Sequence, residues 1–267
     1  MLAREPSRPR DDGDADRHGP LIVDDVGDPA GVPVVYLHGG GDSRLSRHPD
    51  DGIAAGLGVR LLAVDRSGPA VPGRTLLGFA ADLLSTVDER GIDRFAVVGW
   101  SAGGPHALAV AAATPERVTR VVLVASMPVP DGLRDMPQPV RTAIRLARIS
   151  PRLAAPGLER WGRSRTPSTG APETDAAYAR GRAESFRSGG EWLARELAYL
   201  GRPWGFGLAD VRAPVSLWWG DQDTVTPPSI ARDYEWRLEG GELRLVEGTH
   251  QLLFQRWQEI LADAARP

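Results

Sequence analysis

The residue in the clearest chemical context is Ser101, within the sequence FAVVGWSAGG at residues 95–104. This sequence predicts a short apolar strand, a Gly-x-Ser-x-Gly turn and the start of an alanine-rich helix. A helix N-terminus directs N–H groups and the positive end of its dipole toward developing negative charge. Gly99 and Gly103 leave room for close backbone approach. The pattern therefore favours a nucleophilic serine over a glycine-rich turn in which Ser101 only caps the helix.

A serine hydroxyl becomes an effective nucleophile when a base takes its proton and an acid orients that base. His250 and Asp223 each follow a predicted strand. Because parallel strands end at the same edge of a sheet, both side chains are expected near Ser101. The order Ser, Asp, His along the chain is one of the orders in which a nucleophile, its orienting acid and its base are known to occur. We predict Ser101 as nucleophile, His250 as base and Asp223 as orienting acid, with Asp221 and Asp131 as alternative acids.

A second glycine turn, HGGG at residues 38–41, also follows a predicted strand. Glycines let a backbone present its N–H groups at close range to a bound oxygen. We predict the N–H groups of Gly40 and Ala102 as the donors of an oxyanion hole, with Gly41 as an alternative to Gly40. His38 is expected to brace this loop rather than transfer protons.

Alternating apolar runs and helical patterns predict an α/β fold with a mostly parallel central sheet flanked by helices. The expected strands are residues 21–26, 32–37, 59–64, 95–98, 118–124, 215–219 and 243–246. The first is expected to form an antiparallel hairpin through a turn at residues 27–29. A helix is predicted from its cap Thr75 to Gly91. Residues 101–113 and 251–265 also have helical patterns.

The alternation stops between residues 131 and 210, where helical spacing is interrupted by proline and glycine. Structureless connections longer than ~15 residues are uncommon, so this stretch predicts a helical lid inserted before the penultimate strand. The expected division is a disordered tail at 1–19, a core at 20–130, the lid at 131–210 and the rest of the core at 211–267. Four tryptophans are candidates for a substrate pocket, with ordinary packing as the alternative: Trp100, Trp161, Trp192 and Trp204.

Four blocks of sequence together resemble the α/β-hydrolase superfamily, in particular its serine-nucleophile branch. They are YLHGGG at 36–41, VDRSG at 64–68, VVGWSAGG at 97–104, and WWGDQDTVTP with EGTH at 218–227 and 247–250. The branch is similar to proline iminopeptidases, cofactor-free haloperoxidases and epoxide hydrolase-like proteins. The resemblance implies the α/β-hydrolase fold, a mobile lid and, because the nucleophile is serine rather than aspartate, carbonyl substrates.

Two details of the resemblance bear on the site. The pattern DxxxP at residues 223–227 matches the family and favours Asp223 over Asp221 as the orienting acid. After Arg66 the chain reads SGPAVPG, which departs from the family's glycine-turn-serine segment and is shorter than it. The loop that flanks the pocket is therefore expected to be unusual.

Composition limits the other classes of function. The chain has 267 residues, a net charge of −3 and Cys 0, which excludes a thiol nucleophile and thiolate metal sites. All basic residues are arginine, so arginine abundance carries little functional weight. No stretch approaches the ~20 apolar residues of a membrane span, and the first twenty residues lack a secretory pattern. We expect a cytoplasmic monomer or homodimer without cofactor, metal, nucleic-acid or membrane partners.

The expected reaction is transfer of an acyl group from a small-molecule substrate to water. Esters, lactones, thioesters and peptides all pass through a similar tetrahedral intermediate, so the predicted site residues do not separate them. A fold does not fix an activity. A lyase or cyclase, or a small-molecule receptor with a residual triad, therefore remains an alternative.

Overall fold

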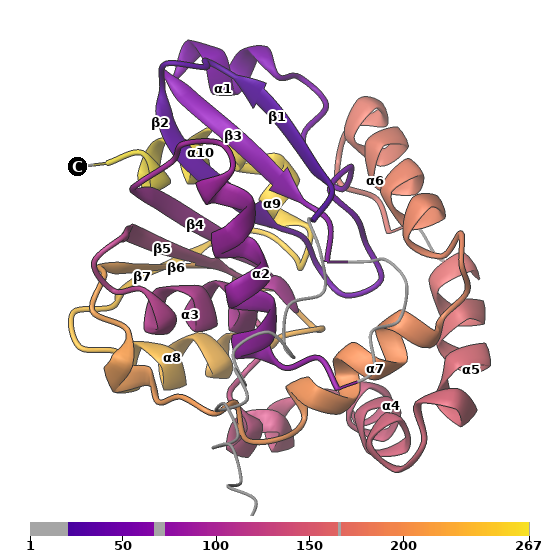
Figure 1. Cartoon of the computed structure of the whole chain (residues 1–267). Helices are drawn as coiled ribbons and strands as arrows, with labels where there is room; N and C mark the ends of the chain where they lie inside the picture. The colour runs from indigo at the N-terminus through magenta and orange to yellow at the C-terminus, as the bar shows by residue number, and fades with distance from the viewer. Residues whose placement is uncertain (1–20, 67–72, 165–166, 267) are drawn as a thin grey trace, which may run out of the picture.

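A seven-stranded sheet forms the centre of the computed structural model, which describes residues 21–66, 73–164 and 167–266 (Figure 1). The strands lie in the order β1-β3-β2-β4-β5-β6-β7, and all except β1 run parallel. Their bounds are β1 Val23–Gly27, β2 Val32–Leu37, β3 Val59–Val64, β4 Phe95–Trp100, β5 Val118–Val124, β6 Val215–Gly220 and β7 Glu242–Val246. The predicted mostly parallel sheet is confirmed.

The predicted hairpin at the start of the sheet is wrong. β1 is antiparallel, but it pairs with β3, with Val23 opposite Val64 and Gly27 opposite Arg60. β3 lies between β1 and β2, so the turn after Gly27 carries the chain past the end of β3. The turn motif correctly predicts that the chain reverses direction after β1. It does not predict which strand pairs with β1, because that strand, β3, lies farther along the chain.

Helices cover both faces of the sheet (Figure 1). One face carries α2 (Leu76–Asp88), α3 (Gly103–Ala113) and α8 (Pro228–Arg237), and the other carries α1 (Gly52–Gly56), α9 (Leu252–Gln255) and α10 (Trp257–Ala264). The inner strands of the sheet, such as β4 and β6, are therefore buried on both sides, as parallel sheets require, whereas the edge strands β1 and β7 are partly exposed.

The sequence predicted the ends of α2 correctly, but it predicted the C-terminal helices α9 and α10 only in part. The Gly78 N–H donates to Thr75 Oγ1 at 3.0 Å, which caps α2 as predicted. Gly91, with φ 65°, follows its end. The single helix expected at 251–265 is instead divided at Arg256 into α9 and α10. Helix α1 was not predicted.

Four further helices lie together at one side of the sheet (Figure 1). They are α4 (Gln138–Ile149), α5 (Pro151–Ser164), α6 (Pro172–Ser185) and α7 (Glu191–Leu200), between 3-10 turns at Pro130–Asp135 and Leu208–Asp210. We call them the α4–α7 segment. Apolar residues on α4, α5 and α7, among them Ile144, Leu158 and Leu193, are buried and continue the core that covers the α2–α3 face of the sheet.

Candidate active site

Ser101 follows β4 in a tight turn with an uncommon backbone conformation. Its φ is 52°, in the left-handed region that residues with a side chain seldom adopt. The Ser101 N–H donates to the Val124 carbonyl at 2.9 Å. Its own carbonyl accepts from the N–H groups of Met127 at 2.9 Å and Gly104 at 3.0 Å. These three backbone hydrogen bonds hold the strained turn in place.

Two glycines allow the chain to approach this closely. A Cβ atom at Gly99 would lie 2.6 Å from the Gly103 carbonyl oxygen, and one at Gly103 would lie 2.2 Å from that of Leu37. Neither position leaves space for a side chain. The glycines therefore let α3 start directly behind Ser101, close to the end of β2, as the sequence pattern indicated.

Ser101, His250 and Asp223 form a continuous hydrogen-bonded chain. His250 Nε2 lies 3.1 Å from Ser101 Oγ, and His250 Nδ1 lies 2.8 Å from Asp223 Oδ2. The three residues follow β4, β7 and β6, parallel strands whose carboxyl ends share one edge of the sheet. The structure thus brings together the three residues that the sequence singled out.

Asp223 is buried and well supplied with hydrogen-bond donors. Its Oδ1 accepts from the N–H groups of Val225 at 2.8 Å and Thr226 at 2.9 Å, and its Oδ2 lies 2.8 Å from Thr226 Oγ1. Burial alone would raise the pKa of Asp223, but His250 and these hydrogen bonds lower it below its usual value. An ionised Asp223 favours a proton on His250 Nδ1 and leaves Nε2 free to accept from Ser101.

The alternative acids have other partners. Asp221 Oδ1 accepts the Gly248 N–H at 3.1 Å, which joins the loops that follow β6 and β7. Asp131 is exposed and forms an ion pair with Arg237, whose Nη2 lies 2.8 Å from its Oδ2. Of the three aspartates, Asp223 is the one whose carboxylate contacts the imidazole.

Gly40 and Ala102 lie side by side next to the serine turn. A Cβ atom at Gly40 would lie 3.3 Å from Ala102 Cβ and 3.6 Å from Leu193 Cδ1. Among the described residues, neither the Gly40 nor the Ala102 N–H donates a hydrogen bond to another part of the chain. Two unused backbone donors therefore lie close to Ser101.

Three of the four candidate tryptophans have distinct environments around this site. Trp100 is buried behind it, and its Nε1 donates to the His250 carbonyl at 3.1 Å. Trp161 is half exposed and faces the glycine turn, since a Cβ atom at Gly41 would lie 3.4 Å from its ring. Trp192 is buried. Trp161 is therefore the one of the three that combines exposure with a place beside the glycine turn.

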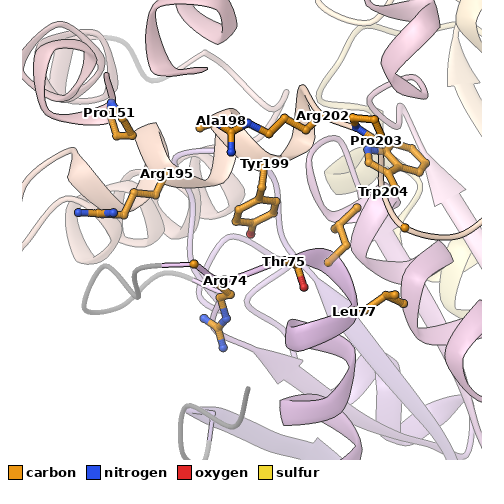
Figure 2. Close-up of a pocket in the computed structure, with 13 residues that line it drawn as sticks. Arg74, Thr75, Leu77, Pro151, Arg195, Ala198, Tyr199, Arg202, Pro203 and Trp204 are labelled. Atoms are coloured by element: carbon orange, nitrogen blue, oxygen red, sulfur yellow. The ribbon is translucent and has the colours of Figure 1, made fainter. Parts of the chain in front are cut away.

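Trp204 lies elsewhere, at a cavity of about 470 Å³ between the start of α2 and the end of α7 (Figure 2). Arg74, Thr75 and Tyr199 line the same cavity, and Ser101 does not. The Trp204 ring stacks on Phe206, and its Nε1 donates to a carbonyl of α7 at 3.2 Å. This cavity is distinct from the space in front of the serine.

A buried ion pair between Arg66 and Glu196, which the sequence patterns did not predict, lies near the glycine turn. Their side chains are 1% and 3% exposed, and Arg66 Nη1 donates to Glu196 Oε1. Arg66 belongs to the VDRSG block, which carried the resemblance without a chemical role for the arginine. Glu196 has no distinguishing signal in the sequence.

The sequence patterns also bear on metal sites, membrane-spanning helices and two unusual segments of the chain. Within residues 21–66, 73–164 and 167–266, no three or more His, Asp or Glu side chains are grouped to hold a metal ion. In the same ranges, every helix is too short or too polar to span a bilayer. The shortened loop after Arg66 and the tail at 1–19 lie largely outside the described residues and stay predictions.

Comparisons with known proteins agree with this architecture. A family model described as "alpha/beta hydrolase fold" matches residues 32–256. An esterase from Rhodococcus sp. ECU1013 has a similar structure, with a TM-score of 0.68 and 23% identity over 91% of this chain and 92% of that chain. A bromoperoxidase from Bacillus anthracis gives a TM-score of 0.70 with 19% identity over 91% and 93% of the two chains. At these identities the structural likeness shows the fold.

One curated relative is similar over a shorter stretch. A pimeloyl-[acyl-carrier protein] methyl ester esterase from Nitrosomonas europaea is 34% identical over 102 residues. The match covers 37% of this chain and 38% of that esterase, so the two proteins align over well under half of their lengths.

Proposed function

The chain belongs to the α/β-hydrolase family, and from this premise we propose that it is a serine hydrolase that acts on a small-molecule ester, lactone, thioester or related acyl compound. The observation that carries the proposal is the position of His250, 3.1 Å from the Ser101 hydroxyl and 2.8 Å from buried Asp223. A base that faces a hydroxyl and is itself oriented by a carboxylate is the arrangement that activates serine.

In the proposed reaction, Ser101 Oγ attacks the carbonyl carbon while His250 Nε2 takes its proton. The oxyanion of the tetrahedral intermediate accepts hydrogen bonds from the Gly40 and Ala102 N–H groups. The imidazolium then protonates the leaving alcohol or thiol, which leaves an acyl group on Ser101. Water, deprotonated by His250, releases the acid. Asp223 stays ionised throughout, and no cofactor takes part in these steps.

The named relatives support ester substrates in particular, since two of the similar proteins are described as esterases. We further propose that the α4–α7 segment acts as a lid over the site. Trp161 is then placed to contact the acyl chain, because it is half exposed beside the glycine turn. Turnover of activated esters separates this hydrolase from a receptor that only binds such molecules.

A fluorophosphonate probe tests the proposal directly. Intact-mass analysis should show one adduct on the parent protein and none on Ser101→Ala, while the exposed-serine control Ser229→Ala keeps the adduct. The parent should also hydrolyse p-nitrophenyl esters with saturation. Absence of an adduct on the folded parent, or an adduct that survives Ser101→Ala, would refute the mechanism.

A further inference from the structure

Arg66 is a buried residue that contacts the backbone carbonyl groups of the glycine turn. Its Nη2 donates to the carbonyl oxygens of His38 and Gly39, the latter at 3.0 Å. Its backbone N–H donates to His38 Nε2 at 3.0 Å. One residue just after β3 therefore holds the turn after β2 through both its backbone and its side chain.

His38 contributes a second hydrogen bond to the same carbonyl. Its Nδ1 lies 2.8 Å from the Gly39 oxygen, and its Nε2 accepts from Arg66, so the proton of the neutral ring lies on Nδ1. Burial and the nearby Arg66 charge lower the pKa of His38 well below its usual value, which keeps the ring neutral. The Gly39 carbonyl thus accepts from two fixed donors.

The Gly39 carbonyl and the Gly40 N–H belong to the same peptide unit. The described peptide bonds are all trans, so these two groups point in opposite directions. A carbonyl held by Arg66 and His38 therefore fixes the direction of the Gly40 N–H. Glycines have wide conformational freedom, so a glycine turn needs such outside contacts to hold one peptide orientation.

Arg66 is itself held by a residue of α7. Its Nη1 donates to Glu196 Oε1, and both side chains are almost completely buried. Removing one member of a buried ion pair leaves an uncompensated charge in a medium of low polarity, which is strongly unfavourable. The position of Arg66 therefore depends on where α7 places Glu196.

We propose that Arg66 is a positioning residue for the oxyanion donor Gly40, and that Glu196 couples this role to the α4–α7 segment. The contacts run from Glu196 to Arg66, from Arg66 to the Gly39 carbonyl, and through one peptide plane to the Gly40 N–H. This inference rests on the proposed serine-hydrolase function. It adds that α7, a helix of the α4–α7 segment, takes part in positioning the N–H group that binds the oxyanion of the transition state.

The test compares Arg66→Lys with the parent at pH 8 on one activated ester. Lysine has a single ammonium group and does not reproduce the fork of the guanidinium that reaches Glu196 and two carbonyls. We expect kcat to fall by about 10² to 10³, the effect of losing one oxyanion donor, with KM changed by less than about threefold. Arg120→Lys, at a buried arginine on β5, is the matched control and should keep the parent kcat.

Inhibitor affinity separates a positioning role from general support of the fold. A boronic acid that becomes tetrahedral on Ser101 should bind Arg66→Lys more weakly by the same factor as kcat/KM falls. The carboxylic acid product should bind as it does to the parent. Equal losses for both ligands, or a kcat within threefold of the parent, would overturn the proposal.

Two further measurements keep the result unambiguous. Complete but slower fluorophosphonate labelling of Arg66→Lys supports the proposal, whereas an unlabelled parent protein would refute the proposed function itself. If Arg66→Lys does not fold, Glu196→Gln decides the question. It should lower kcat by about fivefold to tenfold and weaken boronic acid binding in parallel, because an ion pair is replaced by a hydrogen bond from the guanidinium to a neutral amide. Unchanged boronic acid affinity in that folded variant would overturn the coupling.

Discussion

Asp221 and Asp223 are two residues apart on one loop, yet their carboxylates hold different partners. Asp223 Oδ2 lies 2.8 Å from His250 Nδ1, whereas Asp221 Oδ1 accepts the N–H of Gly248 at 3.1 Å. Asp223 is buried and Asp221 is exposed. One carboxylate is thus placed to orient the imidazole, and the other to join neighbouring loops.

Exchanging each aspartate for asparagine tests this difference. Asp223→Asn keeps the shape but removes the charge that favours the required tautomer, so kcat should fall by about 10³ to 10⁴. Asp221→Asn and Asp131→Asn should stay within about tenfold of the parent. The measurement is kcat on one activated ester, with thermal unfolding followed for each variant. A near-parental rate for folded Asp223→Asn would show that another group orients His250.

The strained backbone at Ser101 predicts a gain in stability on its removal. A left-handed conformation costs a residue with a side chain about 1–2 kcal/mol, and glycine avoids most of this despite its greater freedom in the unfolded chain. Ser101→Gly should therefore unfold in urea with a free energy about 1 kcal/mol higher than that of Ser101→Ala. At Ser85, within helix α2, the same comparison should have the opposite sign. An equal or lower stability of Ser101→Gly would contradict the strain argument.

The tryptophans of the α4–α7 segment and the loop that follows it should differ in their effect on substrate choice. Trp161→Ala should change the ratio of kcat/KM for octanoyl and acetyl esters by about tenfold or more, because the contact of even one methylene with an apolar pocket has about this effect. Trp204→Ala should change it little, since Trp204 lines the other cavity (Figure 2). Both variants should react with a small fluorophosphonate at the parental rate. Parallel loss of labelling and ester turnover in Trp161→Ala would make that residue structural.

Burial of Glu196 predicts a pH-dependent stability. Burial raises the pKa of Glu196 to about 7, although Arg66 and Arg74 oppose the rise and Asp42 adds to it. His106 is a further neighbour, with Nε2 3.7 Å from Glu196 Oε1. Between the ordinary carboxyl pKa of ~4.3 and this value, the folded protein keeps a proton that the unfolded chain has released. The free energy of unfolding therefore falls as pH rises through this range.

Glu196→Gln isolates this contribution, because the variant has no carboxyl proton and keeps the other charged neighbours. The parent's free energy of unfolding minus that of the variant should decrease from about pH 4.5 to 7, by at most about 1.4 kcal/mol per pH unit. Urea unfolding at several pH values measures it. A difference that is constant or increases with pH would contradict the burial argument.

Local sequence patterns were sufficient for most of the core. The six parallel strands are short and mostly apolar, and Thr75 and Gly91 mark the ends of α2 through their own backbone preferences. The partner of β1 was not predictable in the same way. Its pairing with β3 depends on contacts with a strand more than thirty residues away, which a turn at Gly27 does not specify.

The same distinction applies to the candidate site. Ser101, Asp223 and His250 each follow a strand, so a parallel sheet is enough to bring them to one edge. Arg66 and Glu196 are separated by 130 positions. Glu196 lies on an amphipathic helix that carries other charged residues, and only the packing of α7 shows that its side chain is buried.

The Arg66–Glu196 pair also limits how this protein can recombine with its relatives. Replacing the α4–α7 segment by one that lacks an acidic residue facing Arg66 would leave the guanidinium buried without its ion-pair partner. Such a loss costs about 3–5 kcal/mol, a large part of the stability of a typical domain. A single charge therefore decides which segments a chimaera can accept, and a donor segment without it must be exchanged together with residue 66.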